Sequence, residues 1–552
     1  MKILNFKMNT IVFILIIFAA TNVKSFPYTL PGDEKWPNKE EFLQLRLLIQ
    51  GKVIFKGDAD YKPHTWNRIT NIPKPAVIIQ PINSLDIIEG LKFAKKFNIR
   101  LSVQSTGHHQ DHRNIYDNSV HIDMSTMNSK VIDLDKKTLT LGPGNNFSTI
   151  QAFVAAQSNS ELVALCGADK GVGIFGWTSG GGHGPLTRLY GLGVDALISI
   201  DIIVSNFTLI TASETQNQEL FRAIRGSGGS TYGIGVSLTI RLYDDPGKVS
   251  LFNGLYALNT ITSTMFANWM INAPNFSGAY YLMNYIGSDK YVVIYAHCFS
   301  NASTCLQTFE PLKVGCIPSI IPNSCFVNAD KYNNYYQFLN STVSDTEGSV
   351  YLSSTALNST NILNALDEIT IFISKNQYTG CSANSILGGV SSTIDLNQVQ
   401  TSVSIEMRTS LMAITCYSLI GDSDNVSVKK YQVDVMNQLA ETIFKKYSKW
   451  VYWNEPQHEF PSNDWKGRYW GGFDNYNRLL TVKTQYDPEN FFSCYHCVGY
   501  ERMENEDPAV CPQISCTCSN TPNGVCNSSK LLKSNLFTIM NILVFMLFNV
   551  FM

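Results

Sequence analysis

The stretch Gly167–Gly193 reads GADKGVGIFGWTSGGGHGPLTRLYGLG. It contains ten glycines in 27 residues, where average usage gives about two. Backbone that lacks a Cβ can approach a ligand closely, and successive N–H groups form a concavity that binds anions. The stretch therefore predicts a loop that holds a phosphate-bearing ligand, and a pyrophosphate suits it well.

Two further glycine clusters lie on either side of this stretch. Ser105–His109 reads STGHH, and Arg225–Gly233 reads RGSGGSTYG. Glycines in ordinary turns are the alternative interpretation. Three clusters in so short a part of the chain favour three walls of one ligand site.

One motif within the stretch is misleading. Gly171-x-Gly173-x-x-Gly176 formally matches the dinucleotide fingerprint G-x-G-x-x-G, and Asp195 follows 19 residues later. That fingerprint requires a strand before it and a helix that opens on it. The chain instead runs into Ser179–Gly184 (SGGGHG), which cannot open a stable helix, so we exclude a nicotinamide site.

Composition and charge narrow the class of protein. The chain has 552 residues, with 42 Lys and Arg against 44 Asp and Glu, for a formal charge of −2. A near-neutral chain has no basic field that would grip nucleic acid, so no nucleic-acid partner is expected. Hydrophobic residues make up 44%, which excludes disorder for the bulk of the chain.

Both ends carry targeting signals. A basic start, the apolar run Ile11–Ala20 and small residues up to Ser25 predict a secretory signal peptide over residues 1–25. A signal anchor is the alternative, but the run is about half of the ~20 residues that span a bilayer. The apolar end Leu536–Met552 follows small residues and a polar spacer, which predicts a lipid-anchor signal over 529–552. A tail-anchored helix or a buried segment remains the alternative.

Thirteen cysteines in a secreted chain predict disulfides, and the odd number leaves at least one thiol. Cys166 stands alone, far upstream of the others. Cys494-x-x-Cys497 predicts a disulfide rather than zinc, and a cysteine-rich stalk is expected over 501–528. Eight sequons predict surface positions that carry glycans. They are Asn146, Asn206, Asn275, Asn301, Asn340, Asn358, Asn425 and Asn527.

The order of local patterns predicts an α+β fold. Strands are expected at 75–81, 99–105, 196–205 and 235–243, with a helix over Ser84–Asn98 that Ser84 caps. Longer, aromatic-rich strands after Pro246 predict a second, mainly antiparallel sheet covered by helices. Helices are expected near Asn361–Asn376 and over Val428–Tyr447, and residues 404–418 are expected to form a strand.

Four separated stretches carry a family resemblance. They are PAVIIQP (75–81); VQSTGHH (103–109); GVGIFGWTSGGGHGPLTRLYGLGVD (171–195) with LFRAIRGSGGSTYGI (220–234); and YWNEP (452–456) with DNYNRLLTVKTQYDPENFF (474–492). Together they resemble the FAD-linked oxidases of the berberine-bridge-enzyme type, in the vanillyl-alcohol-oxidase superfamily. The resemblance spans about Pro73 to Phe492.

This resemblance implies a domain plan. A two-lobed PCMH-type FAD-binding domain is expected over 71–245, after an N-terminal segment over 26–70. A substrate domain over 246–445 is built on the antiparallel sheet, and the segment 446–500 returns to the flavin.

The resemblance also implies that His108 bonds covalently to the 8α-methyl group of FAD. A neutral imidazole beside the ring system is a plausible nucleophile. His108, His109, Asp111 and His112 as metal ligands are the alternative, but the glycine before His108 fits a flavin loop, and no metal is expected. Many relatives have a second attachment point at a cysteine, where this chain has Asp169. The nearest thiol, Cys166, is three residues early, so a single bond through His108 is expected, and a second link through Cys166 is the alternative.

Further cofactor-binding residues follow from the matched motifs. They are Ser105, Thr106, Gly107, His109, Asp169, Val172, Gly173, Thr178, Ser179, Gly180, Gly181, Gly182, Gly184, Ile234, Asn475 and Tyr476, with Arg478 packed nearby. Val172 matches a position where the family tunes the access of oxygen, and a valine there favours an oxidase.

The expected chemistry needs a base that removes a hydroxyl proton while hydride leaves the adjacent carbon. Tyr452 resembles the family's Tyr-x-Asn element, although its ring could instead only pack under the flavin. A tyrosine base needs a pKa below about 10, lowered by nearby positive charge. Glu406 and Tyr417 are the alternatives. The position of the glutamate in alkaloid-cyclising relatives falls at Thr415 or Cys416, which favours alcohol or carbohydrate oxidation.

The sequence thus predicts a secreted, glycosylated FAD oxidase that acts on a small hydroxyl-bearing substrate and on oxygen. A flavin dehydrogenase with another electron acceptor is one alternative. A cell-surface binding protein that kept the fold and lost catalysis is the other.

Overall fold

The structure is a computed structural model, and it describes residues 28–502 except 68–71, 112, 230, 287–288, 319–323, 343–349, 420–425, 459 and 461–463. The predicted signal peptide, the lipid-anchor signal and nearly all of the predicted stalk lie outside these residues. So do His112 and the sequons at Asn425 and Asn527.

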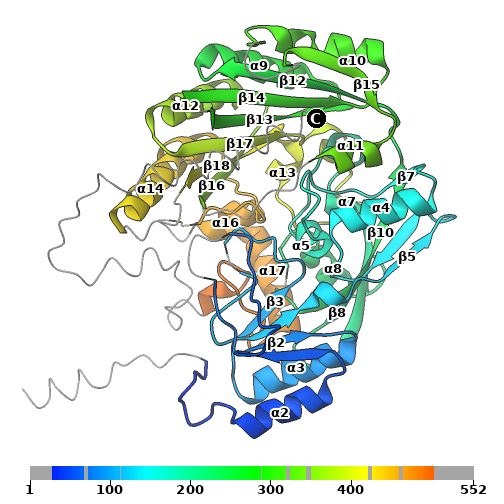
Figure 1. The fold of residues 1–552 in the computed structure, drawn as a ribbon, viewed down its shortest axis with the longest axis vertical. Coiled ribbons are helices and arrows are strands. Elements are labelled where there is room, and N and C mark those ends of the chain that lie inside the picture. Colours follow the sequence, from blue (N-terminus) through cyan, green and yellow to red (C-terminus); the bar gives the residue numbers. More distant parts are fainter. Residues whose placement is uncertain are drawn as a thin grey trace, which may run out of the picture.

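The first lobe contains a small mixed sheet with the strand order β1-β2-β4-β3. Its strands are β1 (Lys52–Phe55), β2 (Val77–Gln80), β3 (Leu101–Gln104) and β4 (Val120–Asp123). The strands β2 and β3 both pair in parallel with β4. Helices α2 (Lys39–Leu48) and α3 (Ser84–Lys96) share a hydrophobic core with this sheet and lie at the lower end of the molecule in Figure 1.

The predicted strands and helix in this region are confirmed, but the helix cap is not. Asn83, not Ser84, is the N-cap of α3, because its side chain accepts a hydrogen bond from the Asp86 N–H at 3.0 Å. An Asn at this position satisfies a backbone donor that has no partner within the helix. Ser84 is the first residue of the helix.

The second sheet of this lobe is antiparallel, with the order β5-β6-β10-β8-β9. Its strands are β5 (Lys130–Asp133), β6 (Thr138–Leu141), β8 (Leu197–Ile203), β9 (Leu209–Ser213) and β10 (Ile234–Arg241). A two-residue pairing of β7 (Leu162–Val163) with β11 (Tyr243–Asp244) lies beside it. Helices near this sheet are α4 (Phe147–Gln157), α5 (Ile174–Ser179), α6 (Thr187–Tyr190), α7 (Gly193–Ala196) and α8 (Gln218–Ile224).

The second lobe is a seven-stranded antiparallel sheet, with the order β15-β12-β14-β13-β17-β18-β16. Its strands are β12 (Val249–Ala257), β13 (Ser277–Ile286), β14 (Asp289–Cys298), β15 (Phe326–Tyr332), β16 (Val350–Leu357), β17 (Thr379–Ser385) and β18 (Met412–Leu419). Helices α9 (Thr260–Asn272), α12 (Ile362–Lys375) and α14 (Val426–Leu439) share the hydrophobic core of one of its faces (Figure 1). The short helices α10 (Ala302–Phe309) and α11 (Tyr335–Ser341) complete this lobe.

Side chains of this sheet alternate between two environments, as the period of a strand requires. Tyr281, Cys381 and Cys416 belong to the core shared with the helices. Their neighbours Tyr280, Ser382 and Thr415 line a cavity on the opposite face. The Cys381–Cys416 disulfide joins two strands on the core face. Thr415 and Cys416, the two positions left open above, therefore have separate roles.

The prediction of a strand over 404–418 is wrong in its first half. Residues Ile405–Thr409 form helix α13, and the strand begins only at Met412. Ser404 caps this helix by accepting from the Glu406 N–H at 3.2 Å. Arg408 also forms a buried bidentate pair with Asp195 of α7, at 2.8 and 3.0 Å. This long-range ion pair holds the segment in a helical turn, and no local pattern reveals it.

The C-terminal segment returns to the first lobe. Helix α14 continues through a π-helical turn at Ala440–Phe444 into α15 (Lys445–Tyr447), and α16 (Trp465–Trp470) and α17 (Phe473–Tyr486) follow. Trp465, Trp470 and Tyr476 share a hydrophobic core with the strands of the five-stranded sheet. The fold is therefore α+β and two-lobed, and the C-terminal segment packs against the first lobe (Figure 1).

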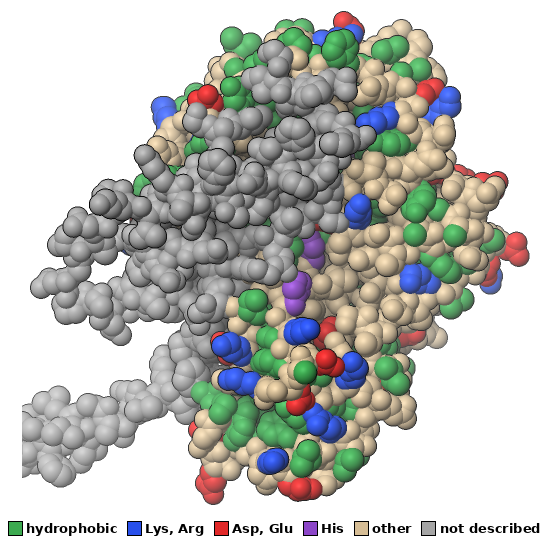
Figure 2. All heavy atoms as spheres, in the orientation of Figure 1, with side chains coloured by type: hydrophobic (Ala, Val, Ile, Leu, Met, Phe, Trp, Pro, Cys, Tyr) green, Lys and Arg blue, Asp and Glu red, His purple; other side chains and the backbone are tan. Residues whose placement is uncertain are grey.

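Four disulfides staple the described part of the chain. They are Cys298–Cys305, Cys316–Cys325, Cys381–Cys416 and Cys494–Cys497. Disulfides persist in oxidising compartments, so their number is consistent with a secreted protein. Among the described residues, no helix combines the length and apolar character needed to cross a bilayer. The face shown in Figure 2 has Lys and Arg interspersed with Asp and Glu rather than gathered into one basic patch.

Candidate active site

A cavity of about 1000 Å³ is lined by residues from both lobes and from the C-terminal segment. The first lobe contributes the loops around Thr106, Gly173 and Gly229. The seven-stranded sheet contributes its helix-free face, and Trp453 to Glu455 complete the wall. This volume is at the upper end of the about 300–1,000 Å³ typical of ligand sites.

His108 and Asp169 face each other at the cavity wall. The Nε2 atom of His108 lies 3.3 Å from a carboxylate oxygen of Asp169. The second Asp169 oxygen accepts from the Gly171 N–H at 2.7 Å, which fixes the carboxylate. The Trp66 ring stacks on His108 with centroids 5.2 Å apart. The imidazole is thus held in one orientation by an acid and an aromatic ring.

The structure brings most of the predicted site residues to this cavity. Those that line it are Ser105, Thr106, Gly107, His108, His109, Asp169, Val172, Gly173, Ser179, Ile234, Tyr417 and Tyr452. Among the residues that the structure describes, the following predicted ones do not line it: Thr178, Gly180, Gly181, Gly182, Gly184, Asn475, Tyr476 and Glu406.

The glycines at 180, 181, 182 and 184 do not line the cavity, and each is packed closely against other parts of the protein. A Cβ on Gly181 would lie 2.6 Å from the Met407 sulfur. A Cβ on Gly182 would lie 2.8 Å from the Trp177 ring, and the φ of Gly182 is +75°. The many glycines of this stretch therefore have two structural causes, which are close packing within the protein and the lining of the cavity. Lining of the cavity is the cause at Gly173, and also at Gly107 and Gly229 of the two neighbouring clusters.

Three other predicted residues have structural partners elsewhere. Asn475 donates to the backbone oxygens of Ser402 and Trp470 at 2.9 Å each. The Tyr476 hydroxyl bonds to Glu501 and accepts from the Gly499 N–H at 3.0 Å. Glu406 accepts a hydrogen bond from Ser404 at the start of α13. These side chains hold the returning segment and helix α13 in place.

Cys166 is buried away from the cavity. Its sulfur lies 3.2 Å from the Tyr335 hydroxyl and 3.6 Å from Nε2 of Gln151. Burial raises the pKa of the Cys166 thiol to about 11, so it stays protonated at neutral pH. Cys166 is therefore a buried thiol that does not line the cavity.

Tyr452 lines the cavity, but its surroundings do not favour a phenolate. Its hydroxyl oxygen accepts from the Gly182 N–H at 3.1 Å and from Nδ2 of Asn454 at 3.0 Å. Burial, and then the charge of Glu455, raise the pKa of Tyr452 above its ordinary value. The lowered pKa that a tyrosine base requires is therefore not produced here.

Glu455 is a site residue that the sequence did not reveal. Its carboxylate lies 3.0 Å from Nε2 of His183 and accepts from the Thr415 hydroxyl at 2.7 Å and from Nδ2 of Asn384 at 3.1 Å. All four residues line the cavity. Burial raises the pKa of Glu455, but the charge of His183 and these hydrogen bonds outweigh it and lower the pKa overall. Its place in the matched YWNEP stretch was the only sequence signal.

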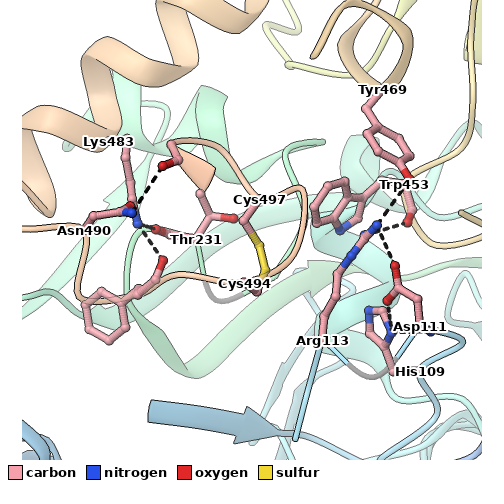
Figure 3. Close-up of a disulfide and its surroundings, with 12 residues drawn as sticks. His109, Asp111, Arg113, Thr231, Trp453, Tyr469, Lys483, Asn490, Cys494 and Cys497 are labelled. Carbon is pink, nitrogen blue, oxygen red and sulfur yellow. Dashed lines mark hydrogen bonds and ion pairs between the residues drawn. A yellow bond between two sulfur atoms is a disulfide. The ribbon is translucent and has the colours of Figure 1, made fainter. Parts of the chain in front are cut away.

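A buried polar cluster supports the loop that carries His108. Asp111 lies 2.8 Å from Nδ1 of His109 and 2.7 Å from the Arg113 guanidinium. That guanidinium also stacks 3.7 Å above the Trp453 ring (Figure 3). The loop is thereby tied to the C-terminal segment.

The C-terminal segment is itself anchored close by. Figure 3 shows Lys483 directed at the backbone oxygen of Thr231, at 2.5 Å, with the Cys494–Cys497 disulfide nearby. The Lys483 ammonium group also donates to the backbone oxygen of Phe492 at 2.6 Å. Cys494 and Thr231 line the cavity. The predicted disulfide at Cys494-x-x-Cys497 is thus formed in the structure. Within the described ranges, no group of three or more His, Cys, Asp or Glu side chains is arranged to hold a metal ion.

The cavity fits a flavin dinucleotide in its chemistry. Apolar side chains such as Val103, Met124 and Ile200 suit planar rings. Polar atoms of Gln110, Asn114 and Thr231, also at the cavity, are buried without a hydrogen-bond partner in the described structure. Buried polar atoms are nearly always paired, so these point to a polar ligand.

Comparisons with known proteins give the same answer. Residues 75–213 match the model of the FAD binding domain, and residues 451–498 match the model for berberine and berberine-like proteins. The chain is 25% identical over 488 residues to the FAD-linked oxidoreductase apf9 of Gibberella fujikuroi, an alignment that covers 79% of this chain and 81% of the relative.

Solved structures share the fold. The VAO-type flavoprotein MtVAO713 from Myceliophthora thermophila superimposes with a TM-score of 0.73 at 19% identity, over 86% of this chain and 98% of that one. A chitooligosaccharide oxidase gives a TM-score of 0.70 at 19% identity, over 83% of this chain and 98% of that one. The chain therefore contains a match to the FAD binding domain and a match to the berberine-like domain, and the curated relative it resembles is an FAD-linked oxidoreductase.

Proposed function

We propose that this protein is an FAD-dependent oxidase that converts a hydroxyl-bearing substrate, a saccharide or another alcohol, to a carbonyl product. The observation that carries the proposal is a single cavity with two different walls. One wall holds the His108–Asp169 pair, and the other is the helix-free face of the seven-stranded sheet, which carries amide and hydroxyl side chains among apolar ones. FAD, when bound, accepts the hydride and passes its electrons to oxygen, which leaves as hydrogen peroxide.

His108 is the proposed point of covalent attachment. Asp169 lies within reach of Nε2 and can hold the proton on that nitrogen. Nδ1 then keeps its lone pair and is the nitrogen that can act as a nucleophile. Asp169 thus stands where relatives place a second attachment residue and orients the first one instead.

The sheet wall supports a polyhydroxylated substrate. Asn253, Asn284 and Asn384 alternate there with Tyr280, Tyr295 and Tyr417, and all of them line the cavity. Amides bind hydroxyl groups, and tyrosine rings offer apolar faces with a polar edge. The shared fold of a chitooligosaccharide oxidase makes oligosaccharides the first class to test.

Val172 supports oxygen as the electron acceptor, because a small side chain at this position leaves room for oxygen. It lines the cavity beside Gly173.

We also propose that the protein is secreted after removal of residues 1–25 and tethered by a lipid at its C-terminus. The sequons at Asn206, Asn275, Asn301 and Asn340 are exposed and can carry glycans.

The experiment supplies the purified chain with cello- and chito-oligosaccharides and with aromatic alcohols, and measures peroxide release and oxygen uptake under air. The proposal expects equal amounts of peroxide and consumed oxygen with at least one of these compounds. Reduction of an artificial dye without peroxide would instead show a dehydrogenase. A yellow protein that no compound bleaches would favour a binding protein.

A further inference from the structure

We infer that Glu455, paired with His183, is the group that takes the proton from the substrate hydroxyl. This inference rests on the proposed oxidase function and names the residue that function needs. It assigns the proton acceptor to a carboxylate rather than to Tyr452.

The position of Glu455 is the first argument. Among the described residues that line the cavity, only Asp169 and Glu455 carry a carboxylate. Asp169 is engaged by His108 and the Gly171 N–H on the cofactor side. Glu455 lies on the substrate side, because Thr415 and Asn384 of the seven-stranded sheet bond to it. Its side chain is 17% exposed, so it remains reachable from the cavity.

The partner of Glu455 is the second argument. His183 is almost fully buried, and its Nε2 atom lies 3.0 Å from the Glu455 carboxylate. Its backbone oxygen accepts from the Trp177 indole at 3.0 Å, which fixes the loop. A carboxylate paired with an imidazole forms a unit that can receive one proton and share it. The described titratable groups near Glu455 are His183, Tyr452 and Tyr280.

The third argument concerns the competing tyrosine. Two donors, the Gly182 N–H and the Asn454 amide, already point at the Tyr452 oxygen. Such donors would help a phenolate, but burial and the adjacent Glu455 charge raise the pKa of Tyr452. Burial also opposes the ionisation of Glu455, but the charge of His183 and the hydrogen bonds from Thr415 and Asn384 outweigh it and keep the carboxylate ionised. The carboxylate is therefore the group that is ready to accept a proton at neutral pH.

The reaction balances with these groups. FAD, when bound, would supply the hydride acceptor, so the electron pair of the substrate C–H bond has a destination. The O–H bond breaks, its electrons form the new C=O bond, and the proton passes to the Glu455–His183 pair. The hydroxyl becomes strongly acidic as the hydride leaves, so a carboxylate is basic enough for this transfer.

The test follows anaerobic bleaching of the flavin in the wild-type protein and in Glu455→Gln, with the oligosaccharide or aromatic alcohol that bleaches the wild type fastest. We expect the limiting rate to fall by about 10²–10⁴-fold while the concentration for half-saturation stays similar. Glu368→Gln is the matched control. Glu368, on helix α12, is also a carboxylate with a lowered pKa, but it pairs with Lys446 of α15. The Glu368→Gln variant should therefore bleach like the wild type.

Two measurements separate a catalytic role from a structural one. Added formate should restore bleaching in Glu455→Ala, because the small acid can occupy the vacated space, and it should not accelerate the wild type. Thermal melting from pH 7 to pH 3.5 requires no turnover. Because the pKa of Glu455 is lowered in the folded protein, its ionised carboxylate stabilises the fold at pH values above the ordinary pKa of a glutamate, and this stability is lost as the pH falls through the folded pKa. The melting temperature of Glu455→Gln should therefore fall less steeply than that of the wild type.

Bleaching of Glu455→Gln within tenfold of the wild type would overturn the inference. Loss of bleaching in Tyr452→Phe but not in Glu455→Gln would overturn it in favour of the tyrosine. If no compound bleaches the wild type, the proposed function fails and the inference falls with it. If the wild type and Glu455→Gln both bleach at similar rates, the proposed function stands and only the inference about Glu455 fails.

Discussion

Lys483 and Asp487 form an ion pair of 2.7 Å in which both side chains are fully buried. The same ammonium group binds the backbone oxygens of Thr231 and Phe492, so one cation joins helix α17, the cavity loop and the segment that follows α17. Burial lowers the pKa of Lys483, and Asp487 counteracts this effect. The pair therefore closes the C-terminal segment over the cavity.

Lys483→Met should destabilise the protein by about 3–5 kcal/mol, because it leaves the Asp487 charge buried without its partner. Lys95→Met is the control, since Lys95 forms an exposed pair with Glu489 and should change stability by less than about 1 kcal/mol. Thermal and urea unfolding measure both. Equal changes in the free energy of unfolding of the two variants would show that the buried ion pair contributes no more stability than the exposed one.

Cys166 should remain unreactive in the folded protein. Its raised pKa, about 11, leaves very little thiolate at pH 8, and its position keeps reagents away. Iodoacetamide followed by mass spectrometry of the Cys166 peptide should show labelling only after unfolding. Rapid labelling of the native protein would contradict the buried placement.

Gly182→Ala should lower the melting temperature, because a φ of +75° strains any residue with a Cβ and the Trp177 ring leaves no room. Backbone strain alone costs about 1–3 kcal/mol. Gly176→Ala is the matched change, since nothing lies within 4 Å of the added Cβ and this glycine is in helix α5. It should be neutral or stabilising by up to about 1 kcal/mol.

We predict that the folded protein loses stability in mild acid because of the buried His297. Burial lowers its pKa to about 4, against 6.5 for a free side chain. The unfolded chain then binds a proton that the folded chain does not, so this contribution is complete above pH 6.5 and is lost between pH 6.5 and 4. The loss amounts to about 3 kcal/mol. In His297→Gln, the melting temperature should fall less steeply over this range, and a slope equal to that of the wild type would refute the assignment.

The sequence predicted the elements that local pattern dictates. Strand β2 lies between two prolines, and α3 has buried residues at Ile87, Leu91 and Ala94, one face of a helical period. Helix α13 was not predicted, because its ends depend on Ser404 and on the distant Asp195. Short helices whose partners come from elsewhere in the fold leave no periodic signal.

The candidate site was predicted where a family motif fixes a residue. His108 and Val172 line the cavity for this reason. Asn475 and Tyr476 match the same motifs but support the backbone instead, because a motif preserves folding contacts as well as ligand contacts. Glu455 was missed, because its function depends on His183 and Thr415, which are distant in the sequence.

The most direct test of the account is the fate of the flavin when the protein is precipitated with acid. The wild type should give a yellow pellet, and mass spectrometry should find FAD on the peptide that contains His108. His108→Ala should release all of its flavin into the supernatant, while Cys166→Ala should keep it in the pellet. A colourless wild-type pellet, or a yellow pellet from His108→Ala, would contradict the central claim that His108 holds the cofactor in this cavity.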